Sequence, residues 1–80
     1  MKIPAIKRAV EIYSIEELIK AETDLMEEIN LMIDIEGADE GEKLTHVLAA
    51  IWIKNDMKKK SSDFNTSLRA YTQKVRTSIN

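Results

Sequence analysis

The stretch Leu44-Thr-His-Val-Leu-Ala-Ala-Ile-Trp-Ile53 decides the fold of this 80-residue chain. Apolar residues recur in it at helical spacing and also occupy the other sides of the helix: Leu44, Val47, Leu48, Ile51, Trp52, Ile53 and two alanines. A helix that is apolar all round either lies at the centre of a fold or has its second face at an interface. The sequence therefore predicts a central helix over about residues 40–58.

Two helices are predicted before this one. Pro4 suits the first turn of a short N-terminal helix, where its missing N–H would have no partner anyway. Ser14 and Glu17 have the spacing of a capping box, in which each side chain bonds the other residue's backbone N–H. The second helix is expected to start there and to run to about residues 28–30.

One helix is predicted after the central one. Asp39 and Glu42 offer an N-terminal cap for the central helix, and Lys58-Lys59-Lys60-Ser61-Ser62 is interpreted as the turn that follows it. The last helix is expected over about residues 63–78, capped by Ser62 or Asp63. Its apolar residues form a near-heptad stripe of Phe64, Leu68, Tyr71, Val75 and Ile79.

The segment 31–36 changes period. Leu31, Ile33 and Ile35 alternate with more polar or flexible residues, which favours a short extended segment. Ile29, Met32, Ile33 and Glu36 fit helical spacing nearly as well, so the segment could also be the tail of the second helix. A lone strand has unpaired backbone groups, so an extended segment here could pair with its copy in a dimer.

The predicted fold class is all-α, a small bundle of three main helices plus a short N-terminal helix, with a short extended segment near 31–36. A chain of this length is expected to form one domain over residues 1–80. The core candidates are Ile6, Val10, Leu18, Ile19, Met26, Leu44, Val47, Leu48, Ile51, Phe64, Leu68, Tyr71 and Val75.

The composition limits what can stabilise the domain. A chain of this size buries only about 60–65% of its extended surface, so its core is thin. It has no Cys, which excludes disulfides and Cys-based metal sites. Small domains without such links often gain stability by oligomerising. This argument and the surplus apolar face of the central helix lead us to expect a homodimer.

The charges are strongly segregated although the net charge is only −2. Residues 1–10 have a net charge of +3, residues 11–42 contain twelve acids and one Lys, and residues 43–80 have a net charge of +6. Helix ends explain about half of these charges, because acids stabilise first turns and Lys stabilises last turns. The remaining charges are interpreted as complementary faces that pair within one chain or across a dimer.

Two functional interpretations of the segregation remain open. The acidic half could dock on a basic protein partner. The basic half could bind nucleic acid, with phosphate contacts from residues of the turn and the last helix. The basic-surface candidates are Lys58, Lys59, Lys60, Arg69, Lys74 and Arg76.

Catalytic motifs are missing from the sequence. It has no Gly-rich phosphate loop, no Cys nucleophile and no plausible Ser-His-acid set, so we expect no enzyme and no cofactor. Asp39, Glu42 and His46 could form a partial metal site, because residues 42 and 46 are one helical turn apart. One His with carboxylates falls short of a zinc site, so His46 is predicted to be a helix-surface or boundary residue.

The leading hypothesis is a small self-associating helical module that binds a protein partner. The partner-interface candidates are Leu31, Ile33, Ile35, Trp52 and Ile53. The alternative is a nucleic-acid-binding module that uses the last helix and the Lys58–Lys60 turn. No apolar run approaches the roughly 20 residues of a membrane span, and the N-terminus lacks a signal-peptide pattern, so a cytoplasmic location without membrane contact is expected.

Three segments resemble a family of short bacterial proteins of unknown function. They are Met1-Lys-Ile-Pro-Ala-Ile-Lys7, Gly37-Ala-Asp-Glu-Gly-Glu-Lys-Leu-Thr-His-Val-Leu-Ala-Ala-Ile-Trp-Ile53 and Leu68-Arg-Ala-Tyr-Thr-Gln-Lys-Val-Arg-Thr-Ser-Ile79. The resemblance implies a free-standing bacterial protein. It brings no activity, cofactor or site residue to any position of this chain.

Overall fold

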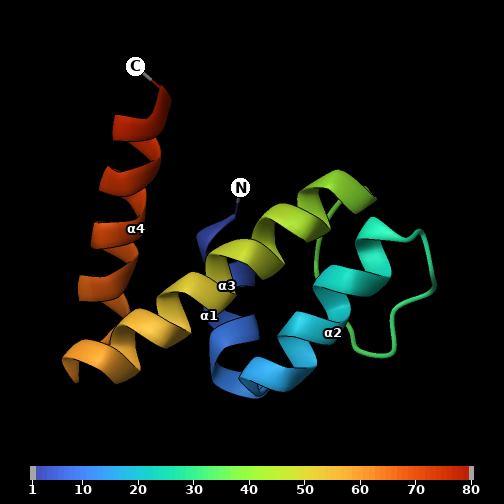
Figure 1. Ribbon diagram of the computed structural model, residues 1–80, viewed down its shortest axis with the longest axis horizontal. Helices are drawn as coiled ribbons and strands as arrows, with labels where there is room; N and C mark the ends of the chain where they lie inside the picture. The colour runs from blue at the N-terminus through green and yellow to red at the C-terminus, as the bar shows by residue number, and fades with distance from the viewer. Residues whose placement is uncertain (1, 80) are drawn as a thin grey trace.

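Four helices form the regular structure of the described chain (Figure 1). The structure, a computed structural model, describes the backbone of residues 2–79 and the side chains of residues 2–76. The helices are α1 (Ile3–Ile12), α2 (Ile15–Met26), α3 (Glu40–Lys60) and α4 (Phe64–Ile79). No strand occurs in this part of the chain. The predicted small all-α bundle is therefore confirmed.

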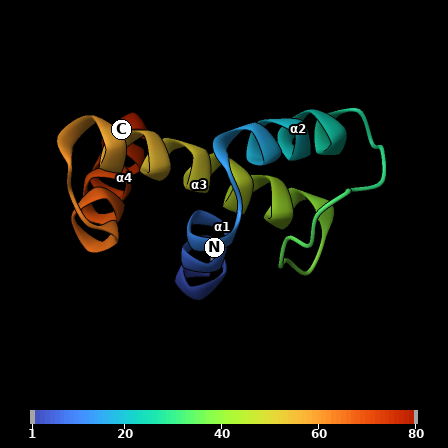
Figure 2. The same cartoon turned by 90° about the horizontal axis from the view of Figure 1, so that it is seen from below.

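Helix α3 is the central element of the fold. It packs against each of the other three helices. Helices α2 and α4 lie on opposite flanks of α3, and α1 crosses behind it (Figures 1 and 2). Val47, Ala50 and Ile53 on α3 are fully buried. A helix that is apolar all round is either central in a fold or at an interface, and α3 is central.

The predicted caps start the second and central helices. The Ser14 hydroxyl accepts the Glu17 N–H at 3.1 Å, and the Glu17 carboxylate accepts the Ser14 N–H at 2.9 Å. Asp39 Oδ1 accepts the Glu42 N–H at 2.7 Å. Each start thus lies where the sequence supplies an oxygen for an otherwise unbonded N–H.

Helix α2 ends earlier than predicted. Its last residue is Met26, because Glu28 adopts the left-handed conformation with φ of 58° and reverses the chain. The Ile29 N–H then donates to the Asp24 carbonyl at 2.8 Å. This backbone pattern is a Schellman motif, which usually has glycine at the left-handed position.

Helix α3 continues further than predicted. Lys58–Lys60 form its last turn, so their assignment to a turn is wrong. The helix ends at Ser61, whose φ is 52°, and the Ser62 N–H donates back to the Met57 carbonyl at 3.1 Å. Three ammonium groups in the last turn stabilise this end against the helix dipole.

The loop between α2 and α3 packs onto the bundle as an irregular segment. Ile35 is only 4% exposed, and Leu31 and Ile33 are half-buried against the core. The Tyr13 hydroxyl donates to the Asp34 carbonyl at 2.9 Å and accepts the Asp34 N–H at 3.1 Å. The predicted period of two is present, but its inward side chains contact their own chain.

The core agrees with the prediction in part. Ile6, Val10, Leu18 and Val47 are buried, whereas Leu44, Ile51, Phe64, Leu68, Tyr71 and Val75 are half-buried. Ile19, Met26 and Leu48 are exposed by 47%, 68% and 42%, so their assignment to the core is wrong. Helix α2 turns Leu18 and Leu25 toward α3, which leaves Ile19 and Met26 outside that contact. The side chain of Ile79 lies outside the described residues.

His46 is fully buried, so its prediction as a surface or boundary residue is wrong. Its Nε2 accepts the backbone N–H of Lys2 at 3.0 Å, and its Nδ1 lies 2.7 Å from the carbonyl oxygen of Glu36. A carbonyl only accepts, so Nδ1 carries the proton and the ring is neutral. Both ring nitrogens are satisfied, which makes the burial of this polar side chain tolerable.

Candidate interaction surface

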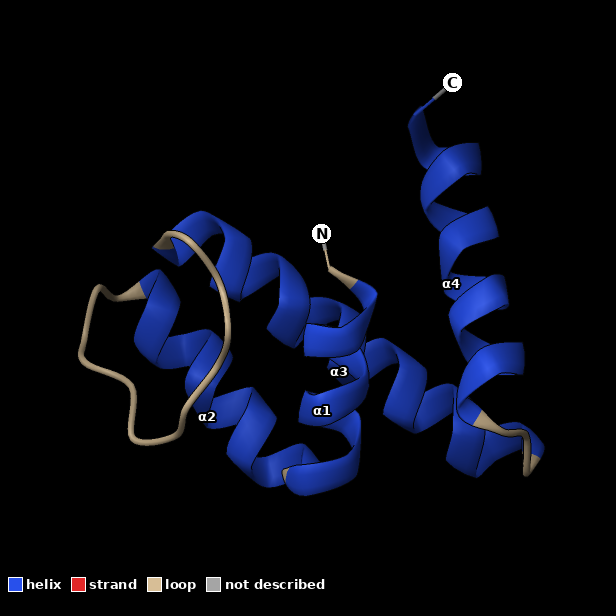
Figure 3. Cartoon of the chain, turned by 180° about the vertical axis from the view of Figure 1, so that it is seen from behind, coloured by secondary structure: helices blue, strands red, loops and turns tan. Residues whose placement is uncertain are grey.

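Helix α4 is anchored to the bundle near its N-terminus. Asp63 Oδ1 accepts the Thr66 N–H at 2.8 Å and caps the helix. Ser67 is fully buried, with its hydroxyl 2.7 Å from that of Ser62, and no other described side chain of α4 is buried. From this end α4 diverges from α3 toward the C-terminus (Figures 1 and 3).

A buried carboxylate lies beneath the anchored end of α4. Asp56 is 8% exposed, and its Oδ1 accepts from the Lys60 ammonium at 3.1 Å. The nearby Ser67 hydroxyl and the Lys60 ammonium hold the pKa of Asp56 below its usual value, against the opposing effect of burial. Its Oδ2 has no hydrogen-bond partner in the described part of the chain. Asp56 therefore stays ionised through groups at the α3–α4 junction.

Above this junction, α3 and α4 present a surface that we call the open face. It consists of six apolar side chains that are half-buried or exposed: Leu48, Ile51 and Trp52 from α3, and Leu68, Tyr71 and Val75 from α4. Ile51, Trp52, Leu68 and Tyr71 also pack against the buried core with part of their surface. The rings of Trp52 and Tyr71 connect the two helices, with centroids 5.6 Å apart and planes inclined by 52°. The α3 side of this face is hollowed between Leu48 and Lys59.

The accessible surface of the whole chain is larger than its mass predicts. It measures 5450 Å² for 9.2 kDa, whereas a compact monomer of this mass has about 4900 Å². The radius of gyration is 12.2 Å, against about 11.6 Å for a compact domain of this length. The chain is therefore slightly more extended than the average compact protein of its size.

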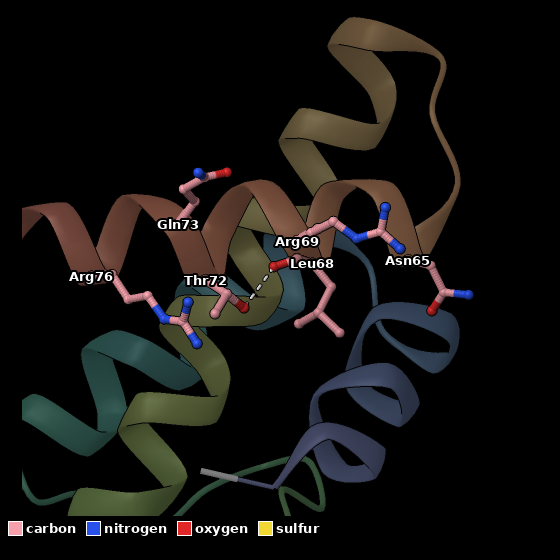
Figure 4. Close-up of a pocket in the computed structure, with 6 residues that line it drawn as sticks. All are labelled: Asn65, Leu68, Arg69, Thr72, Gln73 and Arg76. Atoms are coloured by element: carbon pink, nitrogen blue, oxygen red, sulfur yellow. Dashed lines mark hydrogen bonds between the residues drawn. The ribbon is translucent and has the colours of Figure 1, made fainter.

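One hollow along α4 has a basic and polar lining, and we call it the arginine face. It is lined by Asn65, Leu68, Arg69, Thr72, Gln73 and Arg76 (Figure 4). Arg69 and Arg76 are two helical turns apart, about 10.5 Å along the axis. Arg76 makes no hydrogen bond or ion pair among the described residues, and Arg69 is attracted to Asp63 at the helix start.

The predicted basic surface is distributed over two elements. Lys58, Lys59 and Lys60 belong to the last turn of α3, where Lys60 pairs with Asp56. Lys74 is exposed on α4 but does not line the arginine face. Arg69 and Arg76 are therefore the two basic-surface candidates that the structure places on one helix face, two turns apart.

Among the predicted interface residues, Trp52 belongs to the open face. Leu31, Ile33 and Trp52 all pack against the core as half-buried side chains, and Ile35 and Ile53 are buried in it, so Trp52 differs from Leu31 and Ile33 by its contact with Tyr71 of α4. The interface hypothesis omitted Leu48, Tyr71 and Val75 because their helical spacing also suits a core stripe. The sequence has more apolar side chains than a chain of 80 residues can bury around a single central helix. This surplus is the signal that could have identified them.

The atoms of the partial metal site are occupied by backbone contacts. Asp39 caps α3, the Glu42 carboxylate accepts the Ala38 N–H at 2.9 Å, and both nitrogens of His46 are bonded. No group of three metal-ligating side chains lies together in residues 2–76. No helix of the described chain has the length and apolarity needed to cross a bilayer.

These features define a small four-helix protein with one helix splayed from a compact three-helix unit. The chain belongs to a family of unknown function, DUF6952, whose model matches residues 1–80. No curated protein and no solved structure gives a significant match. The predicted membership in a family of unknown function is confirmed.

Proposed function

We propose that this protein is a small helical interaction module that self-associates through the open face. The observation that supports it is the apolar surface between α3 and α4, where Leu48 is 42% exposed and the stripe of α4 is only half-buried. Apolar side chains grouped on one surface favour association, because each buried Å² contributes about 25 cal/mol. The proposal requires no catalytic group or cofactor, and it includes the expected cytoplasmic location, which cell fractionation would test.

A second copy of the chain is the occupant that we propose for the open face. The basic side of the molecule, α4 with the end of α3, lies opposite the acidic side, α2 with its following loop (Figures 1 and 2). Two copies therefore offer each other complementary charge.

The test is the mass in solution by light scattering after size exclusion, over a range of concentrations. We expect a dimer at twice 9.2 kDa. Leu48→Asp with Val75→Asp should yield a folded monomer, because a carboxylate on the open face would lose its hydration in the dimer. Ile12→Asp is the matched control, since Ile12 is an apolar residue 55% exposed on α1 and should leave the mass unchanged.

Two results would contradict the proposal. One is a wild-type protein that stays at 9.2 kDa up to millimolar concentration. The other is an Ile12→Asp variant that dissociates as readily as the open-face variant. Circular dichroism on each variant verifies that the helices are retained.

Nucleic-acid binding is a second candidate function, and the arginine face is the observation in its favour. Helix α4 contains no acid, and the arginine face combines Arg69 and Arg76 with Asn65 and Gln73, the side-chain types that bond base edges. Binding of a DNA duplex that weakens steeply with salt would support it.

A further inference from the structure

The charges of this molecule are separated at its two ends with little neutralisation inside the chain. Among the described residues, three ion pairs form: Arg8–Asp34, Lys20–Asp24 and Lys60–Asp56. The last two are within single helices. None joins the acidic α2 side to the basic α4 side, although the sequence suggested that these faces could pair.

The carboxyl end of α2 has no compensating cation among the described residues. Its last turn contains no basic residue, and Glu27 and Glu28 follow directly, both exposed. The carboxyl end of a helix has a partial negative charge, so acids at this position are unfavourable and a cation is stabilising. Neither Glu27 nor Glu28 makes a side-chain hydrogen bond or ion pair in the described chain. This end of α2 therefore suits a cationic partner.

The arginine face supplies the matching cations. Arg69 and Arg76 are exposed on one side of α4, next to the open face through Leu68, which belongs to both surfaces. Planar guanidinium groups bond carboxylates in pairs and are less strongly hydrated than an ammonium, which favours Arg at interfaces. An occupant of the open face thus approaches this pair of arginines.

We propose that two copies pack antiparallel, so that the arginine face of each α4 lies against the Glu27–Glu28 end of α2 in the other copy. This inference rests on the proposed self-association and names its orientation. A two-fold axis makes the contact reciprocal, so the assembly closes at two copies and does not extend into a filament. The apolar contact supplies the affinity, and the charge pairs fix the orientation.

The experiment uses two charge-reversal variants of the full chain, Arg69→Glu with Arg76→Glu, and Glu27→Lys with Glu28→Lys. Alone, each variant faces its copy with like charges at both contacts, and we expect its dissociation constant to rise about 100-fold. Mixed together, the two variants restore opposite charges at both contacts and should form a one-to-one heterodimer. Lys2→Glu with Lys7→Glu is the matched control, with the same change in net charge on exposed side chains near α1.

Sedimentation velocity in 50 mM and 500 mM salt gives the readout. A heterodimer on mixing, weaker in high salt, supports the antiparallel arrangement. Variants that dimerise as tightly as the wild type overturn this arrangement and leave self-association through the open face standing. A wild-type monomer at all concentrations overturns the proposed function itself.

Nucleic acid is the competing occupant of the arginine face, and the same variants test it. Loss of DNA-duplex binding in Arg69→Glu with Arg76→Glu, with unchanged dimerisation, would overturn the antiparallel arrangement and assign this face to nucleic acid.

Discussion

Helices α2 and α4 have similar sequence patterns and different degrees of burial. Both are amphipathic, both start at a capped residue and both pack against α3. Helix α2 buries Leu18, Ala21, Asp24 and Leu25, whereas α4 buries Ser67 among its described side chains. The loop after α2 adds Ile35 to the core, whereas the main packing partner of α4 in the described chain is α3. An apolar stripe thus indicates which face of a helix is turned inward, while the neighbouring elements decide how deeply it is buried.

The largest expected effect contrasts a central residue with one of the open face. Ile53→Ala should lower the free energy of unfolding by about 2–5 kcal/mol, because it removes a fully buried side chain and leaves a cavity. Val75→Ala should lower it by less than about 1 kcal/mol in the monomer, because Val75 is half-buried. Urea denaturation at low protein concentration measures both values. Equal losses of unfolding free energy in the two variants would show that the side chains of α4 are packed as tightly as those of α3.

The next effect concerns the contact that joins the N-terminus, the loop and α3. His46→Leu should destabilise the fold by about 2–4 kcal/mol, because the Lys2 N–H and the Glu36 carbonyl would each lose a bond to the ring. His46→Gln is the informative control, because its amide can donate to Glu36. If His46→Gln lowers the free energy of unfolding as much as His46→Leu does, the packing of the ring matters more than these hydrogen bonds.

A smaller effect compares the caps of α2 and α4. Ser14→Ala removes the hydroxyl of the capping box and should cost about 1 kcal/mol of global stability. Asp63→Ala removes the corresponding cap of α4, and we expect it mainly to accelerate amide hydrogen exchange within α4, since that helix has few buried contacts. Equal exchange rates in α2 and α4 of the wild type would argue against this difference.

The smallest effect appears in acid at the α3–α4 junction. The Ser67 hydroxyl and the Lys60 ammonium lower the pKa of Asp56, so its ionised form stabilises the native state above the unfolded pKa of about 3.9. That contribution is lost as the pH falls below this value through the folded pKa. Asp56→Asn should therefore flatten the loss of stability below pH about 4, and Ser67→Ala should reduce it in part. Unfolding by urea between pH 2 and 6 would detect the change. The same loss of stability in acid for Asp56→Asn as for the wild type would contradict it.

Helix starts were predictable from this sequence, whereas helix ends were not. Ser14 and Asp39 place side-chain oxygens beside the first N–H groups, and this signal is local in sequence. The ends of α2 and α3 depend on Glu28 and Ser61 in the left-handed conformation, which glycine would normally mark. Glu and Ser rarely adopt this conformation, so the residue types at these two positions did not mark the helix ends.

The candidate site was predictable to a lesser degree. Trp52 was identified because the central helix is apolar on nearly every side and so has a surplus apolar face. Leu48 and Val75 were assigned to the core, since spacing alone does not say whether a stripe meets its own chain or another one. His46 was misplaced for the opposite reason, because its two partners are backbone groups of the N-terminus and the loop, which no sequence pattern specifies.

The ring contact between Trp52 and Tyr71 has a practical consequence. Trp52 is the only tryptophan of the chain, so all indole emission comes from the junction of α3 and α4. The emission wavelength of Trp52 and its quenching by iodide therefore report whether the contact between α3 and α4 is exposed to solvent, and no attached dye is needed. The native protein thus contains its own optical probe, and a titration of concentration followed by fluorescence would show when a second molecule covers it.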